Sequence, residues 1–256
     1  MLLRGSLLSF ALGLCLSSPV QAIVGGTVDS NSLDFSFIVS IMMTGIFGDV
    51  HICGGTIVGP HTVLTAAHCL DGGSTSSLKI GVGSHDRTSL RKFKIARLVK
   101  HPNWNPSTID SNYGIIITSE NLLLGGLIVP ALLPIVSSDS LTGQTAPMAG
   151  WGQTNPTSPT LPQDLQHGFS TFIDRTACKD EYKSVNSITK TMLCVKKTGL
   201  SSCNGDNGGP ITDPTGLIVV GIMSYGDKDC PVGPDSLPNV ASDVYPVVNW
   251  IRTNRM

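Results

Sequence analysis

Charged residues are scarce in this sequence, and they nearly balance. They make up 14% of the 256 residues, with 17 Lys and Arg against 18 Asp and Glu. No basic excess exists to attract nucleic acid or an anionic membrane, so neither partner is expected. No apolar run reaches the roughly 20 residues that a membrane-spanning helix needs. A usable N-glycosylation sequon is also missing, because Asn105 and Asn155 are each followed by Pro.

Residues 1–22 have the pattern of a secretory signal peptide. The basic residue Arg4 precedes an apolar run over residues 7–16, and small residues at Val20 and Ala22 precede the expected cleavage site. A membrane anchor is the alternative, but the run has about half the length that spanning requires. Cleavage removes one basic residue and no acid, which leaves 16 against 18 and a formal charge of −2. We therefore expect a secreted, extracellular protein of residues 23–256.

The remaining chain predicts an all-β protein. Its 28 Gly and 16 Pro suggest many turns between short strands. Short β-type runs cover residues 35–42, 52–58, 78–82, 93–99, 113–118, 165–172, 217–225 and 240–244. The runs do not alternate with long helices, and no internal repeat is present, so barrels or a sandwich are favoured. Only residues 246–254 have helical spacing of apolar side chains.

Four motifs carry a resemblance to a known family. Residues 203–210 read Cys-Asn-Gly-Asp-Asn-Gly-Gly-Pro, and residues 65–69 read Thr-Ala-Ala-His-Cys. Residues 23–26 read Ile-Val-Gly-Gly, and residues 150–152 read Gly-Trp-Gly. In these motifs and their order the sequence resembles the trypsin/chymotrypsin serine proteases across essentially the whole mature chain. The family's nucleophile loop reads Gly-Asp-Ser-Gly-Gly-Pro, so here Asn stands in place of the attacking Ser.

The resemblance implies a fold of two six-stranded antiparallel β-barrels packed face to face. The first barrel is expected over about residues 23–135 and the second over about 136–245. A short C-terminal helix over about 246–254 completes the expected trypsin-like domain of residues 23–256.

The resemblance also assigns the catalytic positions. His68 takes the place of the general base, Asn112 replaces the orienting aspartate, and Asn207 replaces the nucleophilic serine. An amide nitrogen has its lone pair delocalised into the carbonyl, so no neighbouring base can make it a useful nucleophile. Asp110, two residues before Asn112, is an alternative orienting carboxylate. These substitutions predict a catalytically inactive homologue.

Two supporting features of the family's site are expected to remain. The amides of Gly205 and Asn207 occupy the places of the oxyanion-hole donors. The amino group of Ile23 is expected to form a buried ion pair with Asp206. Because Ala22 rather than a basic residue precedes Ile23, signal peptidase alone would expose this terminus, and no zymogen is predicted.

The specificity pocket is expected to have altered contents. Ser201 stands six residues before Asn207, where trypsins carry an aspartate, so a preference for Lys or Arg is not supported. Residues Ser224, Tyr225 and Gly226 resemble the strand that pairs with an extended substrate. Asn239 replaces a glycine of the pocket wall and is expected to narrow the pocket.

Six cysteines remain after signal removal, which implies three disulfides but leaves fifteen possible connectivities. The resemblance selects three pairs among the mature cysteines: Cys53 with Cys69, Cys178 with Cys194, and Cys203 with Cys230.

No Cys-X-X-Cys or His-X-X-X-His spacing supports a zinc site. A calcium site is not expected, because the loop over residues 81–90 offers only Asp86 as a hard ligand. No metal or other cofactor is predicted.

The segment 42–48 has apolar residues where a solvated turn is expected, and we expect it beside the cleft. It either forms a binding surface or folds Ile46 and Phe47 back onto the barrel.

The whole sequence predicts a monomer that binds a protein or peptide partner of unknown identity, as a decoy, inhibitor or regulator. An active or weakly active serine endopeptidase with an altered triad, and an interaction protein that does not use the cleft, are the alternatives.

Overall fold

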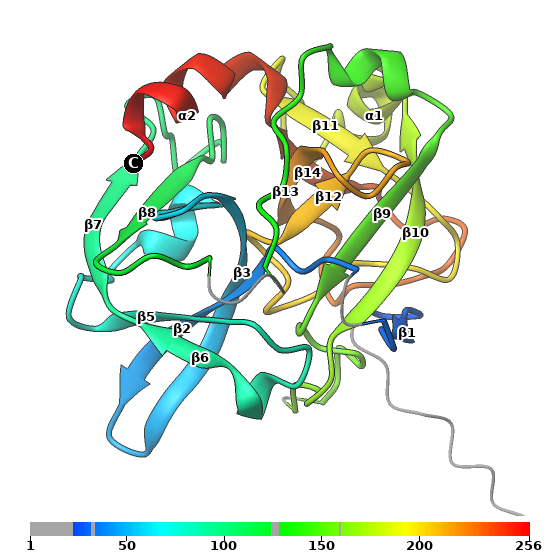
Figure 1. Ribbon diagram of the computed structural model, residues 1–256. Helices are drawn as coiled ribbons and strands as arrows, with labels where there is room; N and C mark the ends of the chain where they lie inside the picture. The colour runs from blue at the N-terminus through cyan, green and yellow to red at the C-terminus, as the bar shows by residue number, and fades with distance from the viewer. Residues whose placement is uncertain (1–22, 32–33, 124–127, 159) are drawn as a thin grey trace, which may run out of the picture.

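The computed structural model describes residues 23–31, 34–123, 128–158 and 160–256, so the expected signal peptide lies outside the described residues. Figure 1 shows two β units side by side, with helix α2 (Val248–Asn254) over the first and helix α1 (Arg175–Tyr182) over the second. The predicted all-β class, the trypsin-like arrangement of two β units and the C-terminal helix are confirmed.

The first unit is a curled seven-stranded antiparallel sheet in the order β6-β5-β2-β3-β4-β8-β7. Its interior holds β-branched and aromatic side chains with no exposure, such as Ile41, Ile80 and Ile116. Alternate residues of a strand face opposite sides, so this packing fixes the register of each pair. The strands are β2 (Ile38–Gly45), β3 (Gly48–Gly59), β4 (Thr62–Thr65), β5 (Leu78–Val82), β6 (Arg91–Phe93), β7 (Ile95–Lys100) and β8 (Gly114–Thr118).

The second unit is a closed barrel, because β10 pairs with both β11 and β9. Strand β1 (Thr27–Val28) lies within the range expected for the first barrel, yet it pairs with β10 of the second. The start of the chain therefore crosses to the second unit. The barrel strands are β9 (Thr145–Gly150), β10 (Gln166–Ile173), β11 (Met192–Val195), β12 (Pro210–Thr212), β13 (Val219–Tyr225) and β14 (Asn239–Asp243).

Within the described ranges, two α-helices and four short 3₁₀ turns accompany the strands. Helix α1 begins where the side chain of Asp174 accepts hydrogen bonds from two backbone amides. Helix α2 buries Val248 and Ile251 in a core that also includes Trp151 of the second unit, so the two units share apolar packing. The 3₁₀ turns are η1 (Ala67–Leu70), η2 (Arg87–Ser89), η3 (Ser138–Leu141) and η4 (Tyr245–Val247).

All three predicted disulfides are present: Cys53–Cys69, Cys178–Cys194 and Cys203–Cys230. The first joins β3 to η1, and the second joins α1 to β11. Cross-links of this kind restrict the unfolded chain and so stabilise the fold. In the described part of the chain, no helix is both long enough and apolar enough to cross a membrane.

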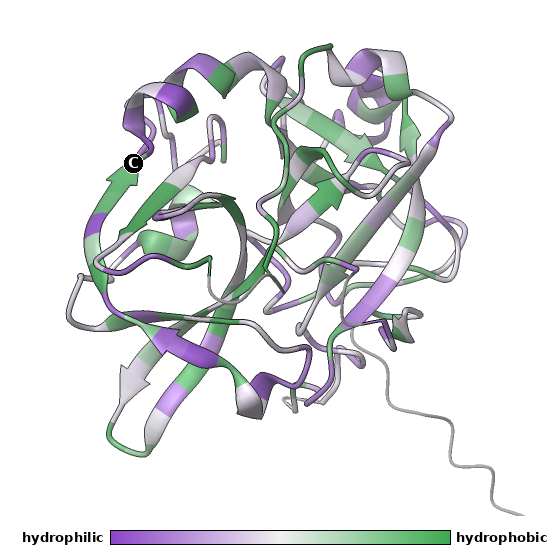
Figure 2. Ribbon diagram, viewed as in Figure 1, coloured by the Kyte–Doolittle hydropathy of each residue, from purple (hydrophilic) through white to green (hydrophobic). Residues whose placement is uncertain are grey.

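The segment 42–48 forms the tip of the β2–β3 hairpin, which projects from the body of the molecule (Figure 1). Ile46 is 93% exposed and Phe47 is 99% exposed. The hydropathy colouring shows the apolar character of this tip (Figure 2). The alternative in which these side chains fold back onto the barrel is therefore wrong.

Candidate functional site

His68 and Asn112 lie in contact at the edge of the first unit. His68 belongs to η1, and Asn112 stands two residues before β8 with no exposure. Asn112 Nδ2 lies 2.8 Å from His68 Nδ1, and Asn112 Oδ1 accepts a hydrogen bond of 3.1 Å from the His68 backbone amide. The second Nδ2 hydrogen of Asn112 is donated to Ser224 Oγ at 2.7 Å.

This arrangement fixes the orientation of the Asn112 carboxamide. Oδ1 must face the His68 N–H, because the alternative would set two donors against each other. Nδ2 then donates to His68 Nδ1, so Nδ1 is an acceptor and the proton of the neutral ring sits on Nε2. A general base for a serine nucleophile needs the opposite tautomer, with Nε2 free to accept a proton.

Burial lowers the pKa of His68, and the nearby Asp71 opposes that shift only in part. The ring is therefore neutral at pH 7. Asp110, the alternative orienting carboxylate, is engaged elsewhere, because its Oδ1 accepts hydrogen bonds from the hydroxyls of Thr189 and Thr191. Within the described residues no hydrogen bond joins Asp110 to His68, so Asp110 does not replace the missing aspartate.

The loop 203–210 brings Asn207 from the second unit toward the first. The carbonyl of Asn207 accepts a hydrogen bond of 2.8 Å from the Gly54 amide in β3. Across the described part of the chain, no hydrogen bond joins the Asn207 side chain to His68. The backbone amides of Gly205 and Asn207 also have no acceptor there, which leaves both donors available. Gly205 has φ +100°, a conformation that L side chains rarely adopt, so the turn depends on glycine.

His51 supports the loop 203–210, a role that the sequence pattern did not predict. Its Nε2 lies 2.9 Å from the carbonyl of Gly205, which can only accept, so Nε2 donates. Nδ1 then accepts from the hydroxyl of Ser40 at 2.7 Å. Burial lowers the pKa of His51 to about 4. The only sequence signal was a histidine two residues before Cys53, which is too weak to identify a loop-positioning residue.

Asp206 is fully buried beneath the Gly-Trp-Gly segment. Its Oδ1 accepts from the Gly152 amide at 2.8 Å, and its Oδ2 accepts from the Cys203 amide at 2.9 Å. A Cβ on Gly150 would lie 2.0 Å from Asp206 Oδ1, and one on Gly152 would lie 2.4 Å from Asp206 Cγ. Both glycines of this motif therefore make room for the carboxyl group.

Burial raises the pKa of Asp206 to about 7, and the two amide hydrogen bonds offset this only partly. A buried carboxylate of this kind needs a cation. Ile23 has no exposure and packs in the core of the second unit, and Val24 next to it forms an antiparallel bridge with Ser201. The side chain of Ile23 is therefore packed in the second unit, and its ion pair with Asp206 stays a prediction.

Asn239 joins the segments that are expected to form the specificity pocket. The Oδ1 of Asn239 accepts hydrogen bonds from Ser201 Oγ at 3.2 Å, from the Ser202 amide at 3.1 Å and from Ser202 Oγ at 2.6 Å. A Cβ on Gly226 would lie only 3.1 Å from the same oxygen. Asn239 thus bridges the walls of the expected pocket, beyond the narrowing predicted from sequence.

The strand positions expected to face a peptide are held by polar contacts. Ser224 Oγ accepts from Asn112, as described above. The hydroxyl of Tyr225 accepts from Asn186 Nδ2 at 3.1 Å, and its ring packs edge-on against Tyr182 at 5.8 Å between ring centroids. The side chain of Tyr225 is therefore fixed rather than free to rearrange.

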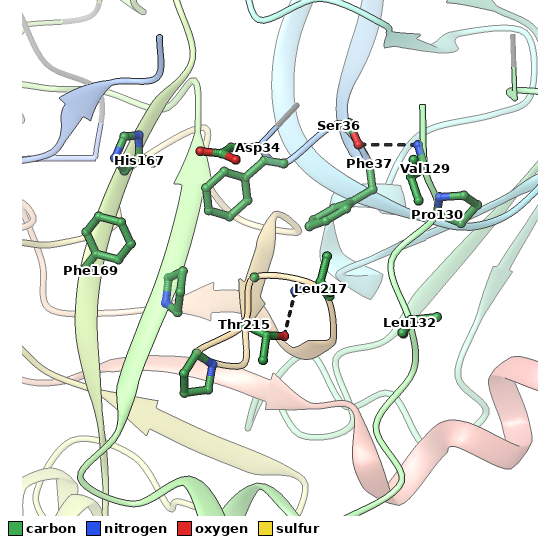
Figure 3. Close-up of a pocket in the computed structure, with 14 residues that line it drawn as sticks. Asp34, Ser36, Phe37, Val129, Pro130, Leu132, His167, Phe169, Thr215 and Leu217 are labelled. Atoms are coloured by element: carbon green, nitrogen blue, oxygen red, sulfur yellow. Dashed lines mark hydrogen bonds between the residues drawn. The ribbon is translucent and has the colours of Figure 1, made fainter. Parts of the chain in front are cut away.

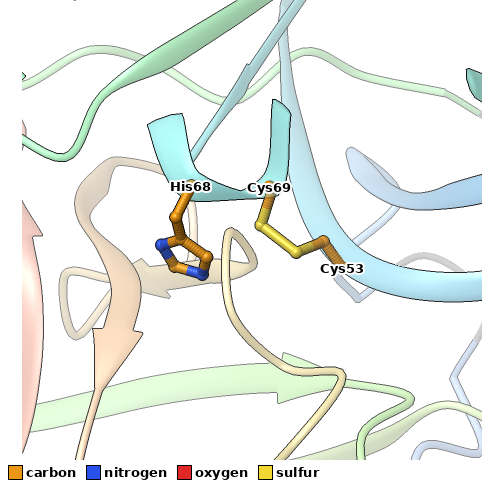
Figure 4. Close-up of side chains that lie close together, drawn as sticks. All are labelled: Cys53, His68 and Cys69. Carbon is orange, nitrogen blue, oxygen red and sulfur yellow. A yellow bond between two sulfur atoms is a disulfide. The ribbon is translucent and has the colours of Figure 1, made fainter. Parts of the chain in front are cut away.

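One cluster of side chains near the site has a spacing that could hold a metal ion (Figure 4). Its sulfur and nitrogen atoms, from Cys53, His68 and Cys69, lie within 4.8 Å of one another. The two sulfurs are joined in a disulfide. Metal-binding cysteines coordinate as thiolates, which this pair does not offer. The cluster is a structural bridge beside the histidine, and its donors do not fit a metal.

Two antiparallel β units that bring the His68–Asn112 contact and a glycine-rich loop together define a chain of the serine-protease-like class. A family model described as Trypsin matches residues 23–251. The chain is 31% identical to Trypsin beta of Drosophila erecta and 30% identical to Trypsin delta of Drosophila melanogaster, each over 234 residues. Each alignment covers 91% of this chain and 88% of the relative. The chain belongs to the trypsin family.

Proposed function

We propose that this chain is a secreted, catalytically inactive member of the trypsin family that acts by binding a protein or peptide partner. The observation that carries the proposal is the Asn112–His68 hydrogen bond, which holds the imidazole in the tautomer that cannot accept a proton at Nε2. Asn207 adds the absence of a nucleophilic hydroxyl.

The rate cost of these two residues is large. Replacing the orienting aspartate by asparagine costs about 10⁴ in kcat in a related protease. Loss of the nucleophile costs roughly 10⁶, and the two losses are not additive because the triad acts as a unit. At 1.36 kcal/mol per tenfold, a 10⁶-fold loss corresponds to about 8 kcal/mol of barrier. The free backbone amides of Gly205 and Asn207 do not compensate for the missing nucleophile.

Two further observations support a binding role without turnover. Asn239 accepts hydrogen bonds from Ser201 and Ser202 where the specificity pocket is expected, which supports a pocket too narrow for a large substrate side chain. No basic residue precedes Ile23, so signal cleavage alone would produce a terminus able to pair with Asp206. Such a constitutively ordered site would be hazardous in an active protease and is harmless in an inactive one. Three disulfides agree with secretion, because such bonds persist in oxidising compartments.

The second candidate is an active or weakly active serine endopeptidase, favoured by the relatives that carry the name trypsin. Stepwise restoration separates the two. Asn207→Ser alone should react poorly with a fluorophosphonate probe, because Asn112 still holds the wrong tautomer. Asn112→Asp with Asn207→Ser should recover labelling, and His68→Ala in that background should abolish it. Strong labelling of the unmodified chain would contradict the proposal.

A further inference from the structure

An apolar groove lies at the seam of the two β units and contains none of the residues of the candidate site. Its volume is about 600 Å³, which falls in the range of about 300–1,000 Å³ typical of ligand sites. In Figure 3, the strand with His167 and Phe169 faces the segment with Val129, Pro130 and Leu132, and the turn with Thr215 and Leu217 lies between them.

The floor of the groove is rigid. Phe35 and Phe37 belong to the main core, are 9% and 4% exposed, and pack edge to face with ring centroids 6.1 Å apart. His167 stacks on Phe35 with centroids 6.4 Å apart and contacts the edge of Phe169 at 5.3 Å. A backbone hydrogen bond of 2.9 Å from Leu132 to Leu217 ties the two sides together. The groove is therefore preformed.

The rim of the groove leaves unusually large apolar surface in water. Val129 and Leu132 are each 59% exposed, Leu217 is 58% exposed and Phe169 is 47% exposed. Four large apolar side chains around one concavity differ from the scattered exposure that is normal for a protein surface. Their exposed apolar surface around the rim suits a polypeptide better than a small enclosed molecule.

Charge selects among polypeptides. The described residues that line the groove include one carboxylate, Asp34, and neither lysine nor arginine. Asp34 is exposed, and its carboxylate accepts a hydrogen bond of 2.9 Å from the neutral side chain of Asn31. An occupant with a positive group beside its apolar anchor would gain an attractive charge pair, and an acidic occupant would meet repulsion.

We propose that this groove binds an apolar segment of a partner protein, with an aromatic or long aliphatic side chain next to a lysine or arginine. The groove lies outside the site that the triad positions define, so this goes beyond the proposed function. Loss of this binding would leave the absence of hydrolysis unchanged, and discovery of hydrolysis would leave the groove unchanged.

The test measures binding of short fluorescein-labelled peptides, in a Gly-Ser host, to the purified protein by fluorescence polarisation. The central pairs are Trp-Lys, Trp-Glu and Ala-Lys. Trp-Lys should bind about fivefold or more tightly than Trp-Glu in low salt, and Ala-Lys should bind worst. Asp34→Asn should remove the preference for lysine over glutamate. Asp180→Asn, an exposed acid on α1, is the matched control and should keep it.

Leu217→Ser and Phe169→Ser should each weaken Trp-Lys binding about tenfold. Val185→Ser, 63% exposed and outside the groove, is the control and should bind as the unchanged protein does. Melting temperatures identify any variant that fails to fold, and Leu217→Lys then serves as a second, exposed-site disruption. Equal binding by all variants, a preference for Trp-Glu, or no peptide binding would overturn the proposal. So would binding of tryptamine alone, or self-association in sedimentation that Leu217→Lys abolishes.

Discussion

At the scale of single residues, one carboxamide determines where His68 carries its proton. An aspartate at position 112 would accept from Nδ1–H, whereas Asn112 donates to Nδ1 because its oxygen is held by the His68 amide. In a related protease the same aspartate-to-asparagine change leaves the geometry intact. The chemical difference is therefore confined to a tautomer and to the charge that would stabilise an imidazolium ion.

The tautomer can be observed directly by ¹⁵N NMR of the His68 ring. We expect Nδ1 to be unprotonated and Nε2 to carry the hydrogen at pH 7. The ring should stay neutral below its ordinary pKa of 6.5, since burial lowers the pKa of His68. Asn112→Asp should move the proton to Nδ1 and raise the pKa by about 1–3 units. A protonated Nδ1 in the unchanged protein would contradict this assignment.

At the scale of elements, the β2–β3 hairpin carries two apolar side chains that the fold does not use. Next to the tip, the carboxylate of Asp49 pairs with Lys79 at 3.1 Å and with Lys92 at 2.8 Å. These contacts hold the pKa of Asp49 well below its usual range. Ile46 and Phe47 are thus exposed at the end of the hairpin and do not contribute to the core.

Removing the tip side chain should therefore have little effect on stability. We expect Phe47→Ser to change the free energy of unfolding by less than about 0.5 kcal/mol. Ile41→Ala, in the same hairpin but with no exposure, is the matched control and should cost about 2–5 kcal/mol. Urea denaturation measures both. A cost for Phe47→Ser similar to that of Ile41→Ala would show that the tip packs against the body in solution.

The predicted strands differ from the observed ones where the sequence pattern is short or interrupted. Strand β4 has four residues and β12 has three, which is too short for a clear alternation. Strand β9 contains Pro147, which has no amide hydrogen and usually argues against a strand. Long apolar runs such as β5 and β8 were predicted within one residue.

At the scale of the whole molecule, the sequence predicted the motif residues but not the groups that position them. His68 and Asn112 were identified by motif and are in contact. The support of Gly205 by His51, and the triple hydrogen bonding of Asn239, depend on residues far apart in the chain. The seam groove combines segments near residues 35, 130, 167 and 217, which no local pattern relates.

Residues that remain attached before Ile23 should also change how the stability of the fold depends on pH. With Ala22 attached the nitrogen of Ile23 is an uncharged amide, and burial raises the pKa of Asp206 from 3.8 to about 7. A carboxyl group whose pKa is raised in the folded state stabilises the fold fully below about pH 4, and this stabilisation is lost as the pH rises to about 7. At 1.36 kcal/mol per pKa unit, the loss in the free energy of unfolding is about 4 kcal/mol. The ammonium group of a free Ile23 should offset this loss.

A chain that begins at Ala22 and a chain that begins at Ile23 make a matched pair for this test. Melting temperatures between pH 4 and pH 7.5 should fall for the first and stay level for the second. Asp206→Asn should flatten the profile of the chain that begins at Ala22. Identical profiles for the two chains would contradict the predicted Ile23–Asp206 ion pair.

The central claim is that this trypsin-family chain does not hydrolyse peptide or ester bonds. The most direct measurement compares turnover of a mixed peptide library and of a nitrophenyl ester by the unchanged protein and by His68→Ala. We predict that both proteins show the same background rate, because neither holds an activated hydroxyl. Turnover by the unchanged protein that His68→Ala abolishes would show that the chain is an active enzyme.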